Sequence, residues 1–88
     1  MRKETTMIIH QLKINKEFAE EVYNGRKKAE VRKNDRHYNV DDRIEFHVID
    51  NLLPIDHYLN NTIWKITHIL GEPWSIPGHV ILSIERVK

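Results

Sequence analysis

The chain contains no cysteine, which excludes a disulfide framework and any site built on thiolates. It has no apolar run near the roughly 18 residues that a helix needs to cross a bilayer, so we expect no membrane partner. The polar opening from Met1 to Thr6 precedes only a short apolar run, Met7 to Ile9, which is too brief for the core of a signal peptide. These absences predict a cytoplasmic protein, with residues 1–6 disordered.

The chain also has little net charge and no repetitive sequence. Its 88 residues allow one domain, 1–88, with one small core, because a chain of this size buries only about 60 to 65 per cent of its unfolded surface. No low-complexity tract or internal repeat is present, which argues against disordered and solenoid classes. A net charge of +1 argues against a uniformly basic surface, although it permits a local one.

The positive charge is concentrated in one segment, residues 25–36, which holds six cationic side chains and two carboxylates. If this segment is a strand, alternation places Lys28, Glu30 and Arg32 on one face. Neighbours two apart on a strand face are about 6.5 to 7 Å apart along the backbone. The Arg32 side chain then reaches Glu30 and still presents its planar fork of donors to a ligand. The opposite face carries Ala29, Val31 and Lys33.

Hydrophobic periodicity predicts five strands and one early helix. The helix is predicted between Asn15, as its N-cap, and Gly25, as the residue that ends it, with Phe18, Ala19 and Val22 in its buried stripe. The strands are predicted over residues 7–14, 28–33, 43–49, 62–70 and 79–87. This set of elements predicts an α+β fold, a small curved β-barrel closed by the helix.

The predicted core consists of alternate residues on three of these strands. We expect His10 to lie among them as a hydrogen-bonded core residue and His47 to point outward. The connection 50–61 is expected to cover one end of the core with Leu52, Leu53, Ile55 and Tyr58. The inward rows are predicted to be Ile8, Leu12 and Ile14, then Ile44, Phe46 and Val48, then Val80, Leu82 and Ile84.

Four residues of the basic segment, Gly25, Lys27, Glu30 and Arg32, match the pattern G-x-K-x-x-E-x-R, and on them the chain resembles the ASCH superfamily of PUA-like domains. It is also similar to a small bacterial and phage subfamily that opens with H-x-L-K-I, here residues 10–14, and continues through R-K-N-D-R, here residues 32–36. Asp41 stands at a turn where that subfamily usually has glycine. The resemblance covers residues 7–87 and implies a PUA-like barrel of five to six strands with one early helix.

The resemblance further implies a cleft beside the helix that binds RNA or a nucleotide. We expect the RNA to be single-stranded, and we expect no cofactor or metal. Cationic side chains that contact phosphate and aromatic rings that stack on bases suit such a ligand. Trp64, in mid-strand, is interpreted as core packing, whereas the loop residue Trp74 suits stacking. We expect Arg32→Ala to abolish RNA binding with little loss of melting temperature. The predicted binding residues are Lys13, Gly25, Lys27, Glu30, Arg32, Lys33, Asn34, Arg36, Tyr38 and Trp74.

Two other functions stay open. Some ASCH relatives hydrolyse acylated cytidine and others cleave RNA, and for such an enzyme Lys27 and Glu30 are the candidate catalytic residues. The amidohydrolase branch, however, has threonine where this chain has Glu30, and it uses a later glutamate for which only Glu72 and Glu85 are candidates. A protein-interaction module with the basic strand as its edge is the other alternative. The six histidines are scattered without the spacing of a ligand pair, so no metal site is predicted.

Overall fold

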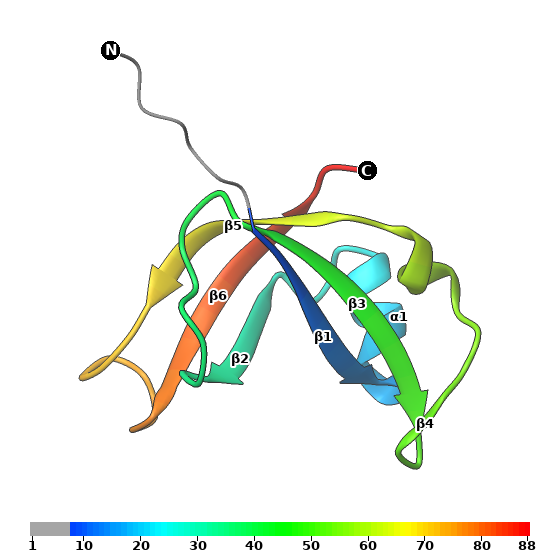
Figure 1. Ribbon diagram of the computed structural model, residues 1–88, viewed down its shortest axis with the longest axis horizontal. Coiled ribbons are helices and arrows are strands. Elements are labelled where there is room, and N and C mark those ends of the chain that lie inside the picture. Colours follow the sequence, from blue (N-terminus) through cyan, green and yellow to red (C-terminus); the bar gives the residue numbers. More distant parts are fainter. Residues whose placement is uncertain (1–7) are drawn as a thin grey trace.

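A mixed six-stranded sheet and one α-helix make up most of the computed structural model, which describes residues 8–88 (Figure 1). The disorder predicted for residues 1–6 lies outside this range. Neither helical element in the described range has the length and hydropathy that a membrane crossing requires. The elements are β1 (Ile9–Asn15), α1 (Lys16–Tyr23), β2 (Ala29–Lys33), β3 (Arg43–Asp50), β4 (Leu53–Pro54), the 3-10 helix η1 (Tyr58–Asn61), β5 (Trp64–Leu70) and β6 (His79–Arg86).

The sheet curls into a half-barrel whose strand order is β1-β3-β5-β6-β2, with the two-residue β4 beside β3 (Figure 1). β1 runs parallel to β3, and the other neighbours are antiparallel. β1 and β2 are therefore the two free edges of the path. The α+β class and a curved sheet of five to six strands with one α-helix are confirmed, whereas the short η1 was not expected.

The core lies on the concave side of the sheet, and strand alternation places it there. The buried pattern along β1 is strictly alternate, and β3 and β6 bury the three residues predicted for each. α1 packs its small face, Ala19 and Val22, against β1, β3 and η1. The core residues are Leu12, Ile14, Ala19, Val22, Ile44, Phe46, Val48, Leu59, Trp64, Ile66, Val80, Leu82 and Ile84.

Several apolar residues predicted to be buried are instead exposed. Ile8 precedes β1 and is 43% exposed, and Phe18 is 49% exposed because the eight-residue α1 turns only its Ala19 and Val22 face inward. Leu52 and Leu53 are 85% and 66% exposed. The reason is a two-residue hairpin turn: Asn51 and Leu52 have φ of 53° and 70°, which places the tip outside the barrel.

The connection 50–61 covers the core mainly with a residue that was not predicted to do so. Leu59 of η1 is fully buried, while Tyr58 is 46% exposed and donates a hydrogen bond from its hydroxyl to Glu20 on α1. Ile55 alone of the four predicted residues packs partly buried against the core. Leu59 was missed because a single turn of 3-10 helix has no periodicity to read.

The segment after α1 brings the basic residues to the sheet. Gly25 has φ of 77°, its N–H donates to Val22 O at 3.0 Å and the Arg26 N–H donates to Glu21 O at 3.0 Å, which is the hydrogen-bond pattern of a Schellman C-cap. The predicted helix stop is thus confirmed. The predicted N-cap is only half right, because Asn15 occupies the cap position without a side-chain hydrogen bond.

The strap, defined here as residues 34–42, links β2 to β3. Its ends are hydrogen-bonded to the loop before β6 and to β5, since Asn34 N–H donates to Gly78 O and Asp41 N–H donates to Ile66 O, both at 2.8 Å. Asp41 has φ of 78°, the left-handed conformation in which glycine is the least strained residue. The turn therefore keeps a glycine-like geometry with aspartate in place.

Candidate functional site

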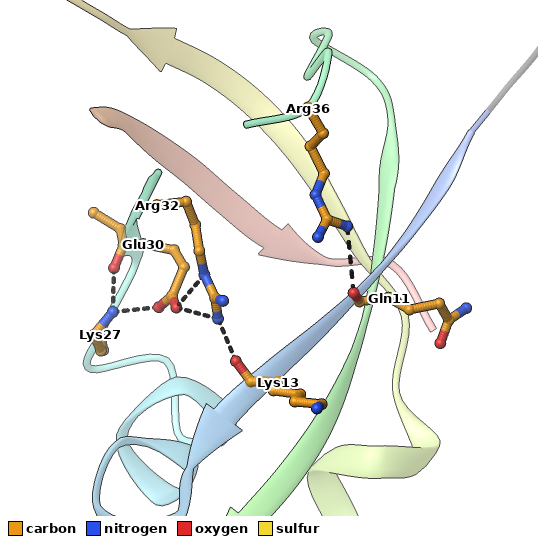
Figure 2. A network of polar contacts seen from close by, with 7 residues as sticks. Gln11, Lys13, Lys27, Glu30, Arg32 and Arg36 are labelled. Atoms are coloured by element: carbon orange, nitrogen blue, oxygen red, sulfur yellow. Dashed lines mark hydrogen bonds and ion pairs between the residues drawn. The ribbon is translucent and has the colours of Figure 1, made fainter. Parts of the chain in front are cut away.

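The two free edges of the half-barrel are joined by arginine side chains rather than by strand pairing. We call the region between the edges of β1 and β2 the seam. The Arg32 Nη2 atom of β2 donates to the main-chain oxygen of Lys13 at 2.7 Å, and Arg36 Nη1 of the strap donates to Gln11 O at 3.4 Å (Figure 2). These bonds supply donors to two carbonyls on the free edge of β1, which a neighbouring strand would otherwise satisfy.

Glu30 is the hub of the polar network on this seam. The residue is 6% exposed, its Oε1 accepts from Lys27 Nζ at 2.5 Å, and its Oε2 accepts from Arg32 Nε at 3.0 Å. Lys27 Nζ also donates to Ala29 O at 2.6 Å (Figure 2). A buried carboxylate is costly unless it is paired and hydrogen-bonded, and two cations meet that requirement here. The three charged residues of the sequence pattern therefore form one connected unit.

Most of the hydrogen-bond donors of the Arg32 guanidinium are used in contacts within the protein. Its Nε and Nη2 atoms both contact Glu30 Oε2, and Nη2 also bonds to Lys13 O. Within residues 8–88 no partner is found for Nη1, and the side chain is 21% exposed. Arg32 thus presents one amino group to the outside rather than the full planar fork expected from the sequence.

A cleft of about 360 Å³ opens along the seam, and we call it the seam cleft. Three cationic side chains, Arg32, Lys33 and Arg36, face one carboxylate, Asp35, in its lining. Its floor reaches the core residue Leu12. The other lining residues are Val31, Tyr38 and His79.

A second cleft of about 540 Å³ lies against the same part of the strap, and we call it the strap cleft. It shares Asp35, Arg36 and Tyr38 with the seam cleft. The rest of its lining carries no Lys or Arg and consists of Asn34, His37, Ile69 and Val80.

Tyr38, which lines both clefts, is held from two sides. Its ring centroid lies 4.7 Å from that of His10, and Arg36 Cζ lies 5.9 Å from the ring centroid. Burial raises the pKa of the Tyr38 hydroxyl above its usual value of 10.0, so the phenol is neutral at physiological pH. A neutral phenol adds no repulsion toward an anionic ligand.

A buried pair beneath Tyr38 fixes the base of the strap. His10 Nε2 lies 2.8 Å from Asp42 Oδ2, and the same carboxylate oxygen accepts from the Asn39 N–H at 3.0 Å. His10 and Asp42 are 6% and 5% exposed. His10 is therefore the hydrogen-bonded core residue that the sequence predicted.

The structure brings together most, though not all, of the residues predicted for the site. Lys13 contributes its main-chain oxygen, while its exposed side chain points away from Arg32 (Figure 2). Trp74 is 76% exposed and lines neither cleft, and Gly25 lines a separate hollow of about 390 Å³ beside Tyr23. Trp64 is a core residue, as interpreted, and its Nε1 donates to Thr62 Oγ1 at 2.7 Å.

Seven residues that line the two clefts were not predicted as site residues: Leu12, Val31, Asp35, His37, Ile69, His79 and Val80. Leu12 and Val80 were assigned only to the core, Val31 only to the strand face opposite Glu30 and Arg32, and His79 only to the start of the last strand. The β2–β6 register pairs Lys33 with His79, and no local sequence signal reports that pairing. Within residues 8–88 there is no cluster of three or more His, Cys, Asp or Glu side chains suited to a metal ion.

A family model described as "Domain of unknown function (DUF3850)" matches residues 9–84, and the chain belongs to this family. The matched range runs from β1 into β6, so it contains the whole seam, the strap and the lining of both clefts. No curated protein matches the chain.

Proposed function

We propose that this protein is a PUA-like domain of the ASCH type that binds single-stranded RNA or a nucleotide in the seam cleft. The observation that carries the proposal is the convergence of Arg32, Lys33 and Arg36 on one cleft beside Tyr38. Phosphate contacts supply most of the affinity of such proteins, and an aromatic ring beside cations suits a base.

Each group has a distinct part in this proposal. Lys33 and Arg36 are exposed and contact phosphate, while Arg32 offers its Nη1 group to a phosphate oxygen or a base carbonyl. Glu30 binds no ligand directly, because both of its oxygens accept hydrogen bonds from Lys27 and Arg32. Its part is to hold Arg32 in one orientation.

Two lysine variants on opposite sides of the seam test the proposal. Lys33 lines the cleft and makes no ion pair within residues 8–88, so Lys33→Gln removes a charge from the cleft without breaking an ion pair. We expect it to weaken binding of fluorescently labelled U8 RNA by roughly 3- to 10-fold at low salt. Lys13→Gln removes the same charge from a side chain that points away from Arg32. We expect it to weaken U8 binding by less than about twofold.

If Lys33→Gln and Lys13→Gln weaken U8 binding equally, then U8 binding depends on the net charge of the protein and not on contacts in the seam cleft. Binding that is insensitive to both variants and to salt favours the protein-interaction alternative, because nucleic-acid binding falls steeply as salt rises.

One observation favours a hydrolytic role as the second candidate: Lys27 Nζ lies 2.5 Å from Glu30 Oε1, which places an amine beside a carboxylate. Neither residue lines the seam cleft or the strap cleft. Incubation with N4-acetylcytidine, followed by chromatography for cytidine, separates the two functions. Turnover that is lost in Glu30→Gln supports the hydrolase, whereas a binding domain gives none.

A further inference from the structure

The seam cleft and the strap cleft adjoin each other across the strap. Their volumes, about 360 and 540 Å³, both fall within the range of about 300–1,000 Å³ that is usual for small-ligand sites. Because Asp35, Arg36 and Tyr38 line both, a ligand in one cleft contacts residues that also border the other. The strap is thus a ridge between two adjacent compartments.

The two compartments differ in chemistry. The seam cleft adds Arg32 and Lys33, together with Leu12, Val31 and His79, to the shared residues, whereas the strap cleft adds the apolar side chains of Ile69 and Val80 with Asn34 and His37, and no Lys or Arg. The first suits an anionic phosphate, and the second suits the flat, uncharged surface of a base and its ribose. Neither compartment alone matches a chain of alternating phosphates and bases.

Arg36, on the ridge, is held much more loosely than Arg32. Its Nη1 bond to Gln11 O is 3.4 Å long, its Nε lies 3.7 Å from Asp35 Oδ1, and its side chain is 43% exposed. Arg32, by contrast, makes bonds of 2.7 to 3.0 Å and is 21% exposed. Little is lost when Arg36 exchanges such weak contacts for a charge-assisted bond to phosphate.

We infer that the ligand is a single strand that crosses the strap, with one nucleotide in each cleft and the phosphate that joins them on Arg36. The smallest ligand that fills the site is then a dinucleotide step, not a mononucleotide. This inference rests on the proposed function and narrows its ligand to an oligonucleotide.

Calorimetric titration with UMP, UpU and U8 RNA tests the inference, with AMP and ApA as a second pair. UpU carries one negative charge, whereas the phosphomonoester of UMP carries close to two at pH 7.5. Tighter binding of UpU therefore cannot come from charge. We expect UpU to bind at least about tenfold tighter than UMP, because its second nucleoside is already tethered at the second cleft.

Two variants of the ridge give opposite expected effects. Arg36→Gln removes the group that contacts the joining phosphate, so UpU binding should weaken more than UMP binding, and the ratio of the UMP to the UpU dissociation constant should fall by about threefold or more. Asp35→Asn removes the carboxylate that repels the phosphate and competes for Arg36, so UpU should bind about two- to fivefold tighter. Both side chains are exposed, so both variants should fold, and circular dichroism of each variant checks this.

The failures are distinguishable. If U8 binds but UpU binds no tighter than UMP, or if Arg36→Gln weakens UMP and UpU by the same factor, the two-cleft inference is overturned and the proposed function stands. If UMP, UpU, U8, AMP and ApA all fail to bind, the proposed function itself fails.

Discussion

At the scale of single residues, Glu30 decides how the seam is built. It is a nearly buried carboxylate whose two oxygens accept from side chains on both sides of it, Lys27 and Arg32. Through Arg32 it is also connected to the main chain of β1. Glu30, which the sequence predicted as a ligand contact, instead supports Arg32, which is a candidate ligand contact.

Replacing Glu30 with glutamine tests that role. Glu30→Gln keeps the shape of the side chain but removes the charge that faces two cations, and we expect the free energy of unfolding to fall by about 1–3 kcal/mol. Urea denaturation measures the change. Glu45→Gln is the matched control, because Glu45 is less buried and its ion pair with His47 spans 3.8 Å, and its cost should stay under about 0.5 kcal/mol. An equal loss of unfolding free energy in the two variants would show that Glu30 is not the centre of the polar network on the seam.

The structure changes what is expected of Arg32→Ala. From the sequence alone, Arg32 was a ligand contact with little bearing on melting temperature. Its bonds to Glu30 and to Lys13 O now predict a stability loss of about 1–2 kcal/mol in addition to the loss of RNA binding. Parallel thermal unfolding and RNA-binding measurements on Arg32→Ala and Arg32→Lys check this, and an unchanged melting temperature for both variants would show that the seam bonds carry no stability.

At the scale of elements, the turn after α1 depends on the backbone conformation of one glycine. Gly25 has φ of 77°, and a Cβ added there would meet no atom within 4 Å, so any cost of substitution comes from the backbone alone. We expect Gly25→Ala to lower the free energy of unfolding by about 1 kcal/mol. Gly25→Asn should cost less, because asparagine tolerates this conformation better. Chemical denaturation that ranks alanine as no worse than asparagine would be inconsistent with this cap.

The contact between η1 and α1 predicts a characteristic pH dependence. The hydrogen bond from Tyr58 lowers the pKa of Glu20 below its usual 4.5, and the same bond raises the pKa of Tyr58 above its usual 10.0. The bond therefore stabilises the fold above pH 4.5 and below pH 10, and this contribution is lost as Glu20 gains a proton or Tyr58 loses one.

Melting curves of Tyr58→Phe from pH 3 to 11 measure this window. The difference in melting temperature from the unmodified chain should be small, constant from about pH 5 to 9, and smaller at both extremes. Tyr38→Phe is the control, because burial raises the pKa of Tyr38 without a carboxylate bond, so its effect should change only on the alkaline side. A Tyr58→Phe difference that does not vary with pH would rule out the bond.

Alternation predicted the inward rows of β3 and β6 correctly because each strand is half-buried and has a period of two. The same kind of reasoning failed at Phe18 and Leu52, where the short α1 and the hairpin turn decide exposure. The parallel pairing of β1 with β3 was beyond sequence reasoning altogether, because that pairing joins segments about thirty residues apart.

At the scale of the whole molecule, the half-barrel leaves its two edge strands, β1 and β2, unpaired with each other, and a cationic cleft lies along the seam between them. Six of the eight residues that line this cleft lie between Val31 and Tyr38 in the sequence, which is why the basic segment could be recognised in advance. The carbonyls of Gln11 and Lys13 and the lining residue His79 come from distant strands, so no local pattern reveals them.

Salt dependence provides a measure of this arrangement as a whole. If phosphates contact two or three of the cleft's cations, the logarithm of the binding constant for U8 should fall with the logarithm of salt with a slope of roughly −1.4 to −2.1, and Lys33→Gln should reduce that slope by about 0.7. Anisotropy titrations from 25 to 200 mM salt give both values. A slope near zero would exclude phosphate contacts.

The most direct measurement is an amide chemical-shift titration of the labelled protein with U8. We expect the largest shifts in residues 31–38 and, across the seam, in residues 11–13, with smaller changes at His79. Shifts confined to the outer face of β3 and β5, around His47 and Lys65, or no shifts at all at millimolar RNA, would contradict this expectation.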